Sequence, residues 1–225
     1  MISIIIPTLN EEKALPATLR GVREQDGDYE VIVVDGGSQD RTRALVQADA
    51  GLRLLTAPKG RSSQMNAGAA KARGEWLLFL HADTLLPDGA LRRLNGFESD
   101  PSIQAGGFLH RFSGDDRRLR LISWLDNFRC RRTRIIYGDQ ALFVRRGLFQ
   151  QLGGFPDQLI LEDVAFCERL VRVVRPVLLS PPVMTDPRKF VTMGVWRSLV
   201  RAILIILHVE LHLPILPRVF FQDIR

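Results

Sequence analysis

The chain has 225 residues, 46% of them hydrophobic, with a formal net charge of +6 and an isoelectric point near 10.0. This length fits one domain whose core is large enough to fold without disulfides. The two cysteines, Cys130 and Cys167, lack Cys-x-x-Cys spacing, which excludes a disulfide framework and a zinc site and indicates reduced thiols in a cytosolic protein. Residues 2–6 are too short an apolar run for a signal peptide, so we expect a cytoplasmic protein. The positive charge indicates acidic partners, namely nucleotide phosphates, anionic lipid or nucleic acid.

The first hundred residues alternate apolar runs with helical patterns. We expect strands at 2–6, 29–35, 52–57 and 75–83, and helices at 11–24, 39–50, 61–73 and 89–97. Continuous apolar strands separated by helices of this length are typical of a parallel sheet covered on both faces. Since such crossovers are right-handed, the pattern predicts a doubly wound α/β fold.

The pattern changes after residue 100. We expect strands at 104–112, 140–146 and 175–180, with Pro181 and Pro182 ending the last one, and helices at 115–132 and 162–173. The helix at 115–132 is basic and amphipathic, with Leu121, Leu125 and Phe128 on one stripe. No repeat or linker divides the chain, so we predict a single domain over 1–225, with functional halves at 1–100 and 101–190 and an apolar helical tail at 191–225.

The tail is interrupted by charged residues and prolines. Its longest uninterrupted apolar run, residues 202–207, is far below the roughly 20 residues needed to span a bilayer. A helix that lies on a membrane surface, one that packs on a partner chain and one that packs on its own domain all remain open.

Polar residues gather where the first four predicted strands end. Each could be a helix cap alone, but the carboxyl ends of parallel strands meet at one edge of a sheet, where ligands bind in open α/β folds. The residues are Asn10 and Glu11 after the first strand, Asp35 and Asp40 after the second, Lys59 and Arg61 after the third, and Asp83 after the fourth.

The residue types at this edge indicate the ligand. The absence of G-x-G-x-x-G and of G-x-x-x-x-G-K-[ST] excludes a dinucleotide fingerprint and a P-loop. Asp35 suits a ribose hydroxyl or a base N–H, and Asp83 suits a hard cation such as Mg²⁺ or Mn²⁺ that completes its shell with phosphates and water. Lys59 and Arg61 suit the same phosphates. The sequence therefore predicts a nucleoside diphosphate site with a divalent metal.

Several segments resemble family 2 glycosyltransferases of the GT-A fold. They are SIIIPTLNEE, EVIVVDGGSQDRT, GRSSQMNAGAAKARGEWLLFLHADT, YGDQALFVRRGLFQQLGGFPD and LILEDVAFCERL, and the closing LPRVFFQDIR resembles the end of a small bacterial subgroup. The resemblance covers nearly the whole chain. It implies an α/β GT-A domain with a mainly parallel sheet, helices on both faces and a C-terminal amphipathic helix. Residues 1–100 would bind the nucleotide sugar, and residues 101–190 would bind the acceptor and carry catalysis.

The resemblance also implies a role for each matching residue on the donor side. Asp83 matches the metal-binding last acid of the family's Asp-x-Asp motif, and His81 replaces the first. An imidazole can still offer one hydrogen bond to a ribose, and it can alternatively ligate the metal. The implied nucleotide-sugar-binding residues are Pro7, Asn10, Glu11, Asp35, Arg61, His81, Asp83 and Arg188.

On the acceptor side, Asp163 matches the catalytic base of inverting members, with Glu162 beside it in support. The alternative for this pair is a helix N-terminus stabilised by the dipole. Gly138, Asp139 and Gln140 match a motif near the acceptor pocket. The resemblance thus implies a hexosyltransferase that uses Mg²⁺ or Mn²⁺ and inverts the anomeric centre. The acceptor hydroxyl is not specified; a lipid-linked acceptor and peripheral contact with the inner face of the plasma membrane are expectations, and nucleic acid is not an expected partner.

Two other functions compete with this interpretation. A nucleotidyltransferase would need a basic loop after the first strand, whereas TLNEEKALP is acidic. A non-catalytic basic module that binds lipid or nucleic acid is favoured by the seven arginines between Arg117 and Arg134, which can equally form a solvated helix face. No basic stretch with interleaved aromatics, of the kind that stacks single strands, accompanies them.

Overall fold

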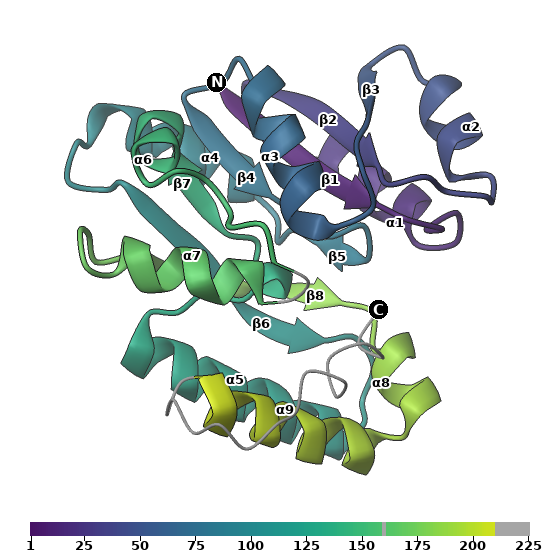
Figure 1. Ribbon diagram of the computed structural model, residues 1–225, viewed down its shortest axis with the longest axis vertical. Coiled ribbons are helices and arrows are strands. Elements are labelled where there is room, and N and C mark those ends of the chain that lie inside the picture. Colours follow the sequence, from purple (N-terminus) through teal and green to yellow (C-terminus); the bar gives the residue numbers. More distant parts are fainter. Residues whose placement is uncertain (159–160, 210–225) are drawn as a thin grey trace.

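The computed structural model of the protein describes residues 1–158 and 161–209. Within this part, eight strands form one curled sheet in the order β3-β2-β1-β4-β7-β6-β8-β5 (Figure 1). The strands are β1 (Ile2–Thr8), β2 (Tyr29–Asp35), β3 (Leu52–Thr56), β4 (Trp76–Phe79), β5 (Thr84–Leu85), β6 (Ala105–Phe112), β7 (Phe143–Arg145) and β8 (Val177–Thr185).

The described helices fall between and after these strands. They are α1 (Leu15–Arg23), α2 (Thr42–Gln47), α3 (Arg61–Lys71), α4 (Ala90–Gly96), α5 (Arg117–Thr133), α6 (Arg146–Gln151), α7 (Glu162–Leu170), α8 (Arg188–Met193) and α9 (Val195–Val209), with short 3-10 helices η1 (Phe97–Ser99) and η2 (Gly138–Gln140). The prediction of an α/β fold with helices on both faces and a C-terminal helix is confirmed. The predicted tail beyond residue 209 lies outside the described residues.

The sheet is parallel in its first half and mixed in its second. β3, β2, β1 and β4 are all parallel neighbours, and β6 pairs in parallel with β8. β7 runs antiparallel to both β4 and β6 and so joins the two halves. The carboxyl ends of β1 to β4 consequently lie along one edge, as predicted.

Two cores cover the sheet, one on each face. Alternate residues of β1 point to opposite sides: Ile4 and Ile6 pack with α1 and α4, whereas Ile5 packs with α3, α6 and α7. Both faces of the strand are fully buried, which explains why the sequence shows continuous apolar runs instead of alternation.

The prediction that Pro181 and Pro182 end the last strand is wrong. β8 continues through both prolines to Thr185, and its register against β6 shifts between Phe108 and His110. Proline cannot donate to a β-ladder, but at such an irregularity no donor is needed, so the strand passes through. The continuation lets β8 pair with β5, a two-residue strand that the apolar pattern did not reveal.

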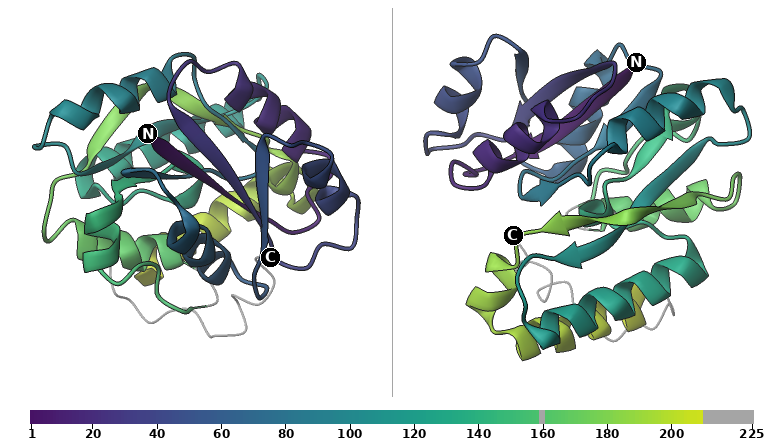
Figure 2. Two further views of the ribbon diagram at one scale, coloured as in Figure 1. Left: turned by 90° about the horizontal axis from the view of Figure 1, so that it is seen from above. Right: turned by 180° about the vertical axis from the view of Figure 1, so that it is seen from behind.

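A layer formed by α5 and α9 lies below the end of the sheet, at the bottom of Figure 1 and of the right-hand view in Figure 2. Leu119 and Ile122 of α5 pack with Val195 and Leu199 of α9, and Phe112 from the end of β6 completes this third core. No helix in the described ranges has the length and apolar character that crossing a membrane requires.

Both cysteines are buried in the core between the sheet and α7. Burial raises the pKa of the Cys130 thiol to about 11 and raises that of Cys167 as well, whose Sγ donates to the Ile136 carbonyl at 3.3 Å. The expectation of two free thiols is confirmed.

Candidate active site

The loops after β1 and β2 are joined by reciprocal hydrogen bonds. The Asn10 amide donates to Ser38 Oγ at 2.9 Å, and the Gln39 amide donates back to Asn10 Oδ1 at 2.8 Å. The Glu11 amide donates to Thr42 Oγ1 at 2.8 Å. Asn10 adopts a left-handed φ of 56°, a conformation that asparagine tolerates better than most residues. The two loops therefore form one unit at the predicted ligand-binding edge.

Asp40 strengthens the same unit. Its carboxylate accepts hydrogen bonds from the amides of Glu12 and Thr42, at 3.0 and 2.9 Å. Burial alone would raise the pKa of Asp40, but the hydrogen bonds from Thr42 and Glu12 outweigh it and hold the pKa below its usual range. Asp40 thus acts within the loops themselves.

Asp35, at the end of β2, is fully buried. Its carboxylate accepts hydrogen bonds from the backbone amides of Gly37 and Ser38, both at 3.0 Å. Gln64 of α3 reaches the same place and donates from Nε2 to the carbonyls of Thr8 and Val34, each at 2.8 Å. Asp35 therefore fixes the shape of the β2 loop, and its predicted contact with the base or ribose stays a prediction.

The turn of His81, Ala82 and Asp83 follows β4 directly. Its backbone is held from two sides, since Thr18 Oγ1 donates to the Ala82 carbonyl at 2.7 Å and the Asp186 amide donates to the Asp83 carbonyl at 3.1 Å. The predicted strand over 75–83 is too long, because β4 ends at Phe79. Asp83 is therefore presented from a tight turn next to the end of β8.

Gly138 brings His81 and Asp163 together from distant parts of the chain. Its amide donates to Asp163 Oδ2 at 2.5 Å. A Cβ placed on Gly138 would lie 2.5 Å from His81 Nε2 and 3.2 Å from Asp163 Oδ2. The backbone of Gly138 thus fills the space between the two side chains, and only glycine fits there without a shift of a neighbour.

Glu162 and Asp163 occupy the first turn of α7, where the helix dipole favours carboxylates. Leu161 holds the N-cap position, so neither acid caps the helix. Asp163 Oδ1 accepts from the Val164 amide at 2.8 Å, and the residue is only 8% exposed. Glu162 Oε1 lies 3.9 Å from Arg61 Nε. α7 therefore connects the predicted base with a predicted phosphate-binding arginine.

Arg188, at the start of α8, forms a close ion pair with Glu11. Its amide also donates to Asp186 Oδ1 at 2.9 Å. The pair ties the end of the chain's second half to the loop after β1. Nothing in the sequence spacing of residues 11 and 188 indicates this contact, although both were predicted to line the donor site.

A second polar cluster lies near Asp163. His110, which is 2% exposed, places its Nε2 atom 3.7 Å from Asp139 Oδ2. Arg129 donates to Asp126 Oδ1 at 2.8 Å and to Gln140 Oε1 at 3.4 Å. The cluster surrounds the predicted acceptor-side segment from the β6 and α5 sides.

Asp139 is the perturbed acid of this cluster. Burial raises its pKa above the usual value of 3.8, and the charges of Asp126 and Asp163 raise it further, while His110 and Arg129 oppose them. The side chain retains 31% exposure, but its Oδ1 atom is buried and accepts no hydrogen bond from the described residues. The protonated form of the Asp139 carboxyl group, or a hydrogen-bond donor beside its Oδ1 atom, would therefore be favoured at this position.

The side chains at this edge can share a divalent cation with a ligand. In the described ranges, no group of three or more His, Cys, Asp and Glu is arranged to hold a metal ion, which gives no support to His81 as a further ligand. Mg²⁺ and Mn²⁺ bind at nucleotide sites through one or two carboxylates, with substrate phosphates and water completing the shell. Asp83 offers a hard carboxylate at the predicted position, so it fits a cation of that kind.

The structure thus gathers most of the predicted residues at one edge of the sheet. Pro7 lies buried within β1 opposite Val34, and Lys59 is exposed. Sequence reasoning did not single out residues whose contacts depend on long-range pairing. These are Gln64, His110 and Asp186. Asp126 and Arg129, a pair within α5, were also not singled out.

Comparison with known proteins supports an enzyme. The sequence profile described as Glycosyl transferase family 2 matches residues 3–152. The chain is 38% identical over 165 residues to a PGL/p-HBAD biosynthesis glycosyltransferase of Mycobacterium tuberculosis, which covers 69% of this chain and 63% of that protein. It is 30% identical over 135 residues to the undecaprenyl-phosphate 4-deoxy-4-formamido-L-arabinose transferase of Aeromonas hydrophila, covering 55% and 39%. The chain therefore spans less than two thirds of the length of these relatives.

Among solved structures, a mannosyltransferase from Pyrobaculum calidifontis in complex with GDP-Man and Mn²⁺ aligns with a TM-score of 0.62 at 24% identity, covering 82% of this chain and 56% of that one. This likeness shows the fold. Fold and site together define an α/β domain of the GT-A type whose predicted ligand-binding edge lies at the carboxyl ends of β1 to β4. The profile match and the Mycobacterium relative make it specific: the chain belongs to glycosyltransferase family 2. Membership of this family favours the first of the three functions that the sequence left open.

Proposed function

We propose that the protein transfers a hexose from a nucleoside diphosphate donor to an acceptor hydroxyl, with inversion at the anomeric carbon. The observation that carries this proposal is that the backbone of Gly138 lies between the side chains of His81 and Asp163 and close to both. The turn that carries the predicted metal ligand therefore lies next to the predicted base. The proposed donor would lie on the His81 side of Gly138, and the proposed acceptor would lie on the Asp163 side.

Asp163 is the proposed general base. A hydroxyl is a weak nucleophile and needs a group that takes its proton as it attacks. The two amides of Gly138 and Val164 each use one lone pair of the Asp163 carboxylate, which leaves further lone pairs for a substrate proton. Direct displacement with one base inverts the anomeric centre.

The donor side must stabilise the leaving diphosphate. Arg61 and Arg188 are the proposed basic side chains, since Glu162 and Glu11 hold them at the same edge of the sheet. Asp83 would hold Mg²⁺ or Mn²⁺, which when bound neutralises charge on the diphosphate. The GDP-Man and Mn²⁺ of the Pyrobaculum structure support this choice of ligands.

The acceptor is proposed to be a lipid-linked hydroxyl at the inner face of the plasma membrane. The undecaprenyl-phosphate transferase relative supports this choice. The residues around it would be Gly138, Asp139 and Gln140, beside the His110 and Arg129 cluster. Contact of the predicted tail, residues 191–225, with the bilayer stays a prediction.

Asp163→Asn tests the base. Asparagine retains one carbonyl oxygen, so it keeps one of the two backbone hydrogen bonds and should cost about 1 kcal/mol of stability. Turnover should fall on the order of 100-fold or more, because the amide cannot take a proton. Release of nucleoside diphosphate from a panel of UDP- and GDP-hexoses with Mn²⁺ measures turnover, and calorimetric titration with UDP and GDP checks that donor binding is retained. Asp157→Asn, the same change at an exposed position, is the control. Near wild-type turnover in Asp163→Asn would remove the proposed base.

A further inference from the structure

The outer face of α5 is apolar and exposed. Leu121, Trp124, Leu125 and Phe128 have exposed fractions of 47%, 58%, 38% and 50%. Their spacing of three and four residues places them on one stripe of the helix. The rings of Trp124 and Phe128 stack with their centres 5.8 Å apart. This is the stripe expected from the sequence, but it faces away from the core that Leu119 and Ile122 build on the other side of α5.

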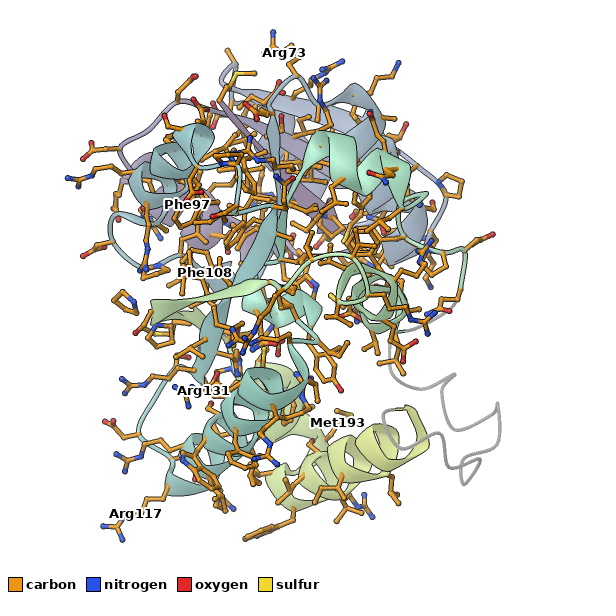
Figure 3. The ribbon with its side chains drawn as sticks, turned by 90° about the vertical axis from the view of Figure 1, so that its left-hand side faces the viewer. Arg73, Phe97, Phe108, Arg117, Arg131 and Met193 are labelled. Atoms are coloured by element: carbon orange, nitrogen blue, oxygen red, sulfur yellow. The ribbon has the colours of Figure 1, made fainter. Side chains whose placement is uncertain are left out.

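Arginines extend this stripe at both ends. Arg117 lies four residues before Leu121, and Arg132 lies four residues after Phe128, with its guanidinium 5.7 Å from the Phe128 ring centre. Figure 3 shows Arg117 reaching outward from the first turn of α5. Asp116 and Asp126 pair with Arg118 and Arg129. The exposed arginines Arg117, Arg120, Arg131 and Arg132 therefore add positive charge around the apolar stripe.

α9 carries an exposed apolar stripe of its own. Trp196, Val200 and Ile203 recur at steps of four and three residues and are 59%, 56% and 43% exposed. α9 lies beside α5 in Figures 1 and 3 and packs against it through Val195 and Leu199. The two helices thus present neighbouring apolar stripes, each with a tryptophan.

We propose that this surface, the α5–α9 face, docks on an anionic lipid bilayer. The face is defined by Leu121, Trp124, Leu125, Phe128, Trp196 and Val200. An amphipathic helix with tryptophan, phenylalanine and leucine on one side and arginines around them is typical of proteins that lie in the membrane interface. Arginines at the rim are attracted by the negative headgroups, and their long side chains allow the apolar stem to remain in contact with lipid. The arginines around the stripe would provide no electrostatic attraction to an uncharged protein partner.

Docking in this orientation would bring the bilayer to the acceptor side. The inner side of α5 contacts the predicted acceptor-side segment, since Arg129 lies over the Tyr137 ring at 3.6 Å and bonds Gln140. Asn127 exchanges hydrogen bonds with the backbone of His110, both at 2.8 Å. One helix therefore joins the proposed membrane surface to the acceptor side. The inference deepens the proposed lipid-linked acceptor, but its test needs neither donor nor acceptor.

Co-sedimentation of the full chain with vesicles tests the proposal. The protein should sediment with vesicles of phosphatidylcholine containing 30% phosphatidylglycerol at about 50 mM salt, and much less with pure phosphatidylcholine or at about 500 mM salt, where the screening length falls to a few ångströms. Trp124→Ser/Phe128→Ser should lower the partition coefficient at least about tenfold. Arg117→Gln/Arg132→Gln should lower it about 25-fold, since each interfacial arginine contributes about fivefold.

Two matched controls leave the face intact. Val173→Ser removes an apolar side chain that is 56% exposed elsewhere, and Arg20→Gln/Arg43→Gln removes the same charge from α1 and α2. Both should bind vesicles like the wild type, and far-UV circular dichroism checks that every variant is folded. In a Trp196→Phe variant, brominated lipid should quench Trp124, because Trp76 is buried.

Three results would overturn the proposal. The first is no sedimentation of the wild type with anionic vesicles. The second is equal loss of binding in the face variants and in their controls. The third is a dimer in solution that Trp124→Ser/Phe128→Ser dissociates while vesicle binding is absent, which would identify a second copy as the occupant. Loss of sugar transfer with vesicle binding retained would argue against the proposed function alone.

Discussion

Gly138→Ala is the most direct structural test of the proposed arrangement of His81, Gly138 and Asp163 between the donor and acceptor sides. The new Cβ would lie 2.5 Å from His81 Nε2 and 2.8 Å from Cε1, whereas comfortable contacts between such atoms are about 3.5 Å or more. His81 begins a turn whose backbone is held by Thr18 and Asp186, so relief of the clash requires rotation of the His81 ring or a shift of the backbone at Gly138. Overpacking of this kind typically costs about 1–3 kcal/mol. In a chain of this size the melting temperature should fall by about 2–4 °C per kcal/mol.

The effect on activity should exceed the effect on stability. The Gly138 amide also positions Asp163 Oδ2, so any shift of the backbone at 138 moves the proposed base. A misplacement of about 1 Å can cost on the order of 100-fold in rate, and we expect a loss of turnover between about 10- and 100-fold. The assay is nucleoside diphosphate release combined with thermal unfolding.

The control and the double variant separate this clash from a general effect of alanine. Gly147→Ala places a Cβ in open space on α6 and should leave both stability and turnover nearly unchanged. In a His81→Ala background the main clash is gone, so Gly138→Ala should cost less than about 1 kcal/mol there, a coupling that a double-mutant cycle measures. Equal cost in both backgrounds, or behaviour of Gly138→Ala like that of Gly147→Ala, would refute the reasoning.

The remaining predictions concern the predicted metal ligand Asp83 and the acid Asp139. Asp83→Ala should keep the fold but lose the extra thermal stabilisation that Mn²⁺ provides in the presence of UDP or GDP, measured by thermal shift with and without Mn²⁺; retention of that increment would exclude Asp83 as the ligand. Asp139→Asn should melt higher than the wild type at pH 7 to 8, because the raised pKa of Asp139 means that the folded state loses stability as pH rises through it. The advantage should shrink as pH falls toward 3.8, the usual pKa, and an advantage independent of pH would contradict the assigned burial effect.

The strands and their carboxyl ends could be predicted because they depend on short-range patterns. A short β-branched apolar run such as residues 31–34 indicates a strand buried on both faces, and the acid that follows it, Asp35, then lies at the carboxyl edge of the sheet. The elements missed are those without such a pattern. β5 has two residues, and β8 passes through two prolines because an irregularity in its pairing removes the need for their donors.

The contacts that build the site could not be predicted, because they join residues far apart in the chain. Glu11 meets Arg188 only after β8 has brought the second half against the first, and His110 meets Asp139 only after β6 has packed beside η2. The helical period also predicts which residues share a face of a helix, but it does not predict what that face packs against. Leu121 and Phe128 followed the helical period as expected, yet they lie on the exposed side of α5.

The two buried thiols make the protein convenient to label. A thiol reacts as its thiolate, so a pKa of about 11 for Cys130, together with the burial of both cysteines, leaves the native sulfurs nearly inert to maleimides at neutral pH. A cysteine introduced on the surface, for example Leu121→Cys, would then be the one reactive thiol without removal of either native residue. A polarity-sensitive dye or spin label attached there would report the environment of α5 residue by residue, in an otherwise unaltered chain.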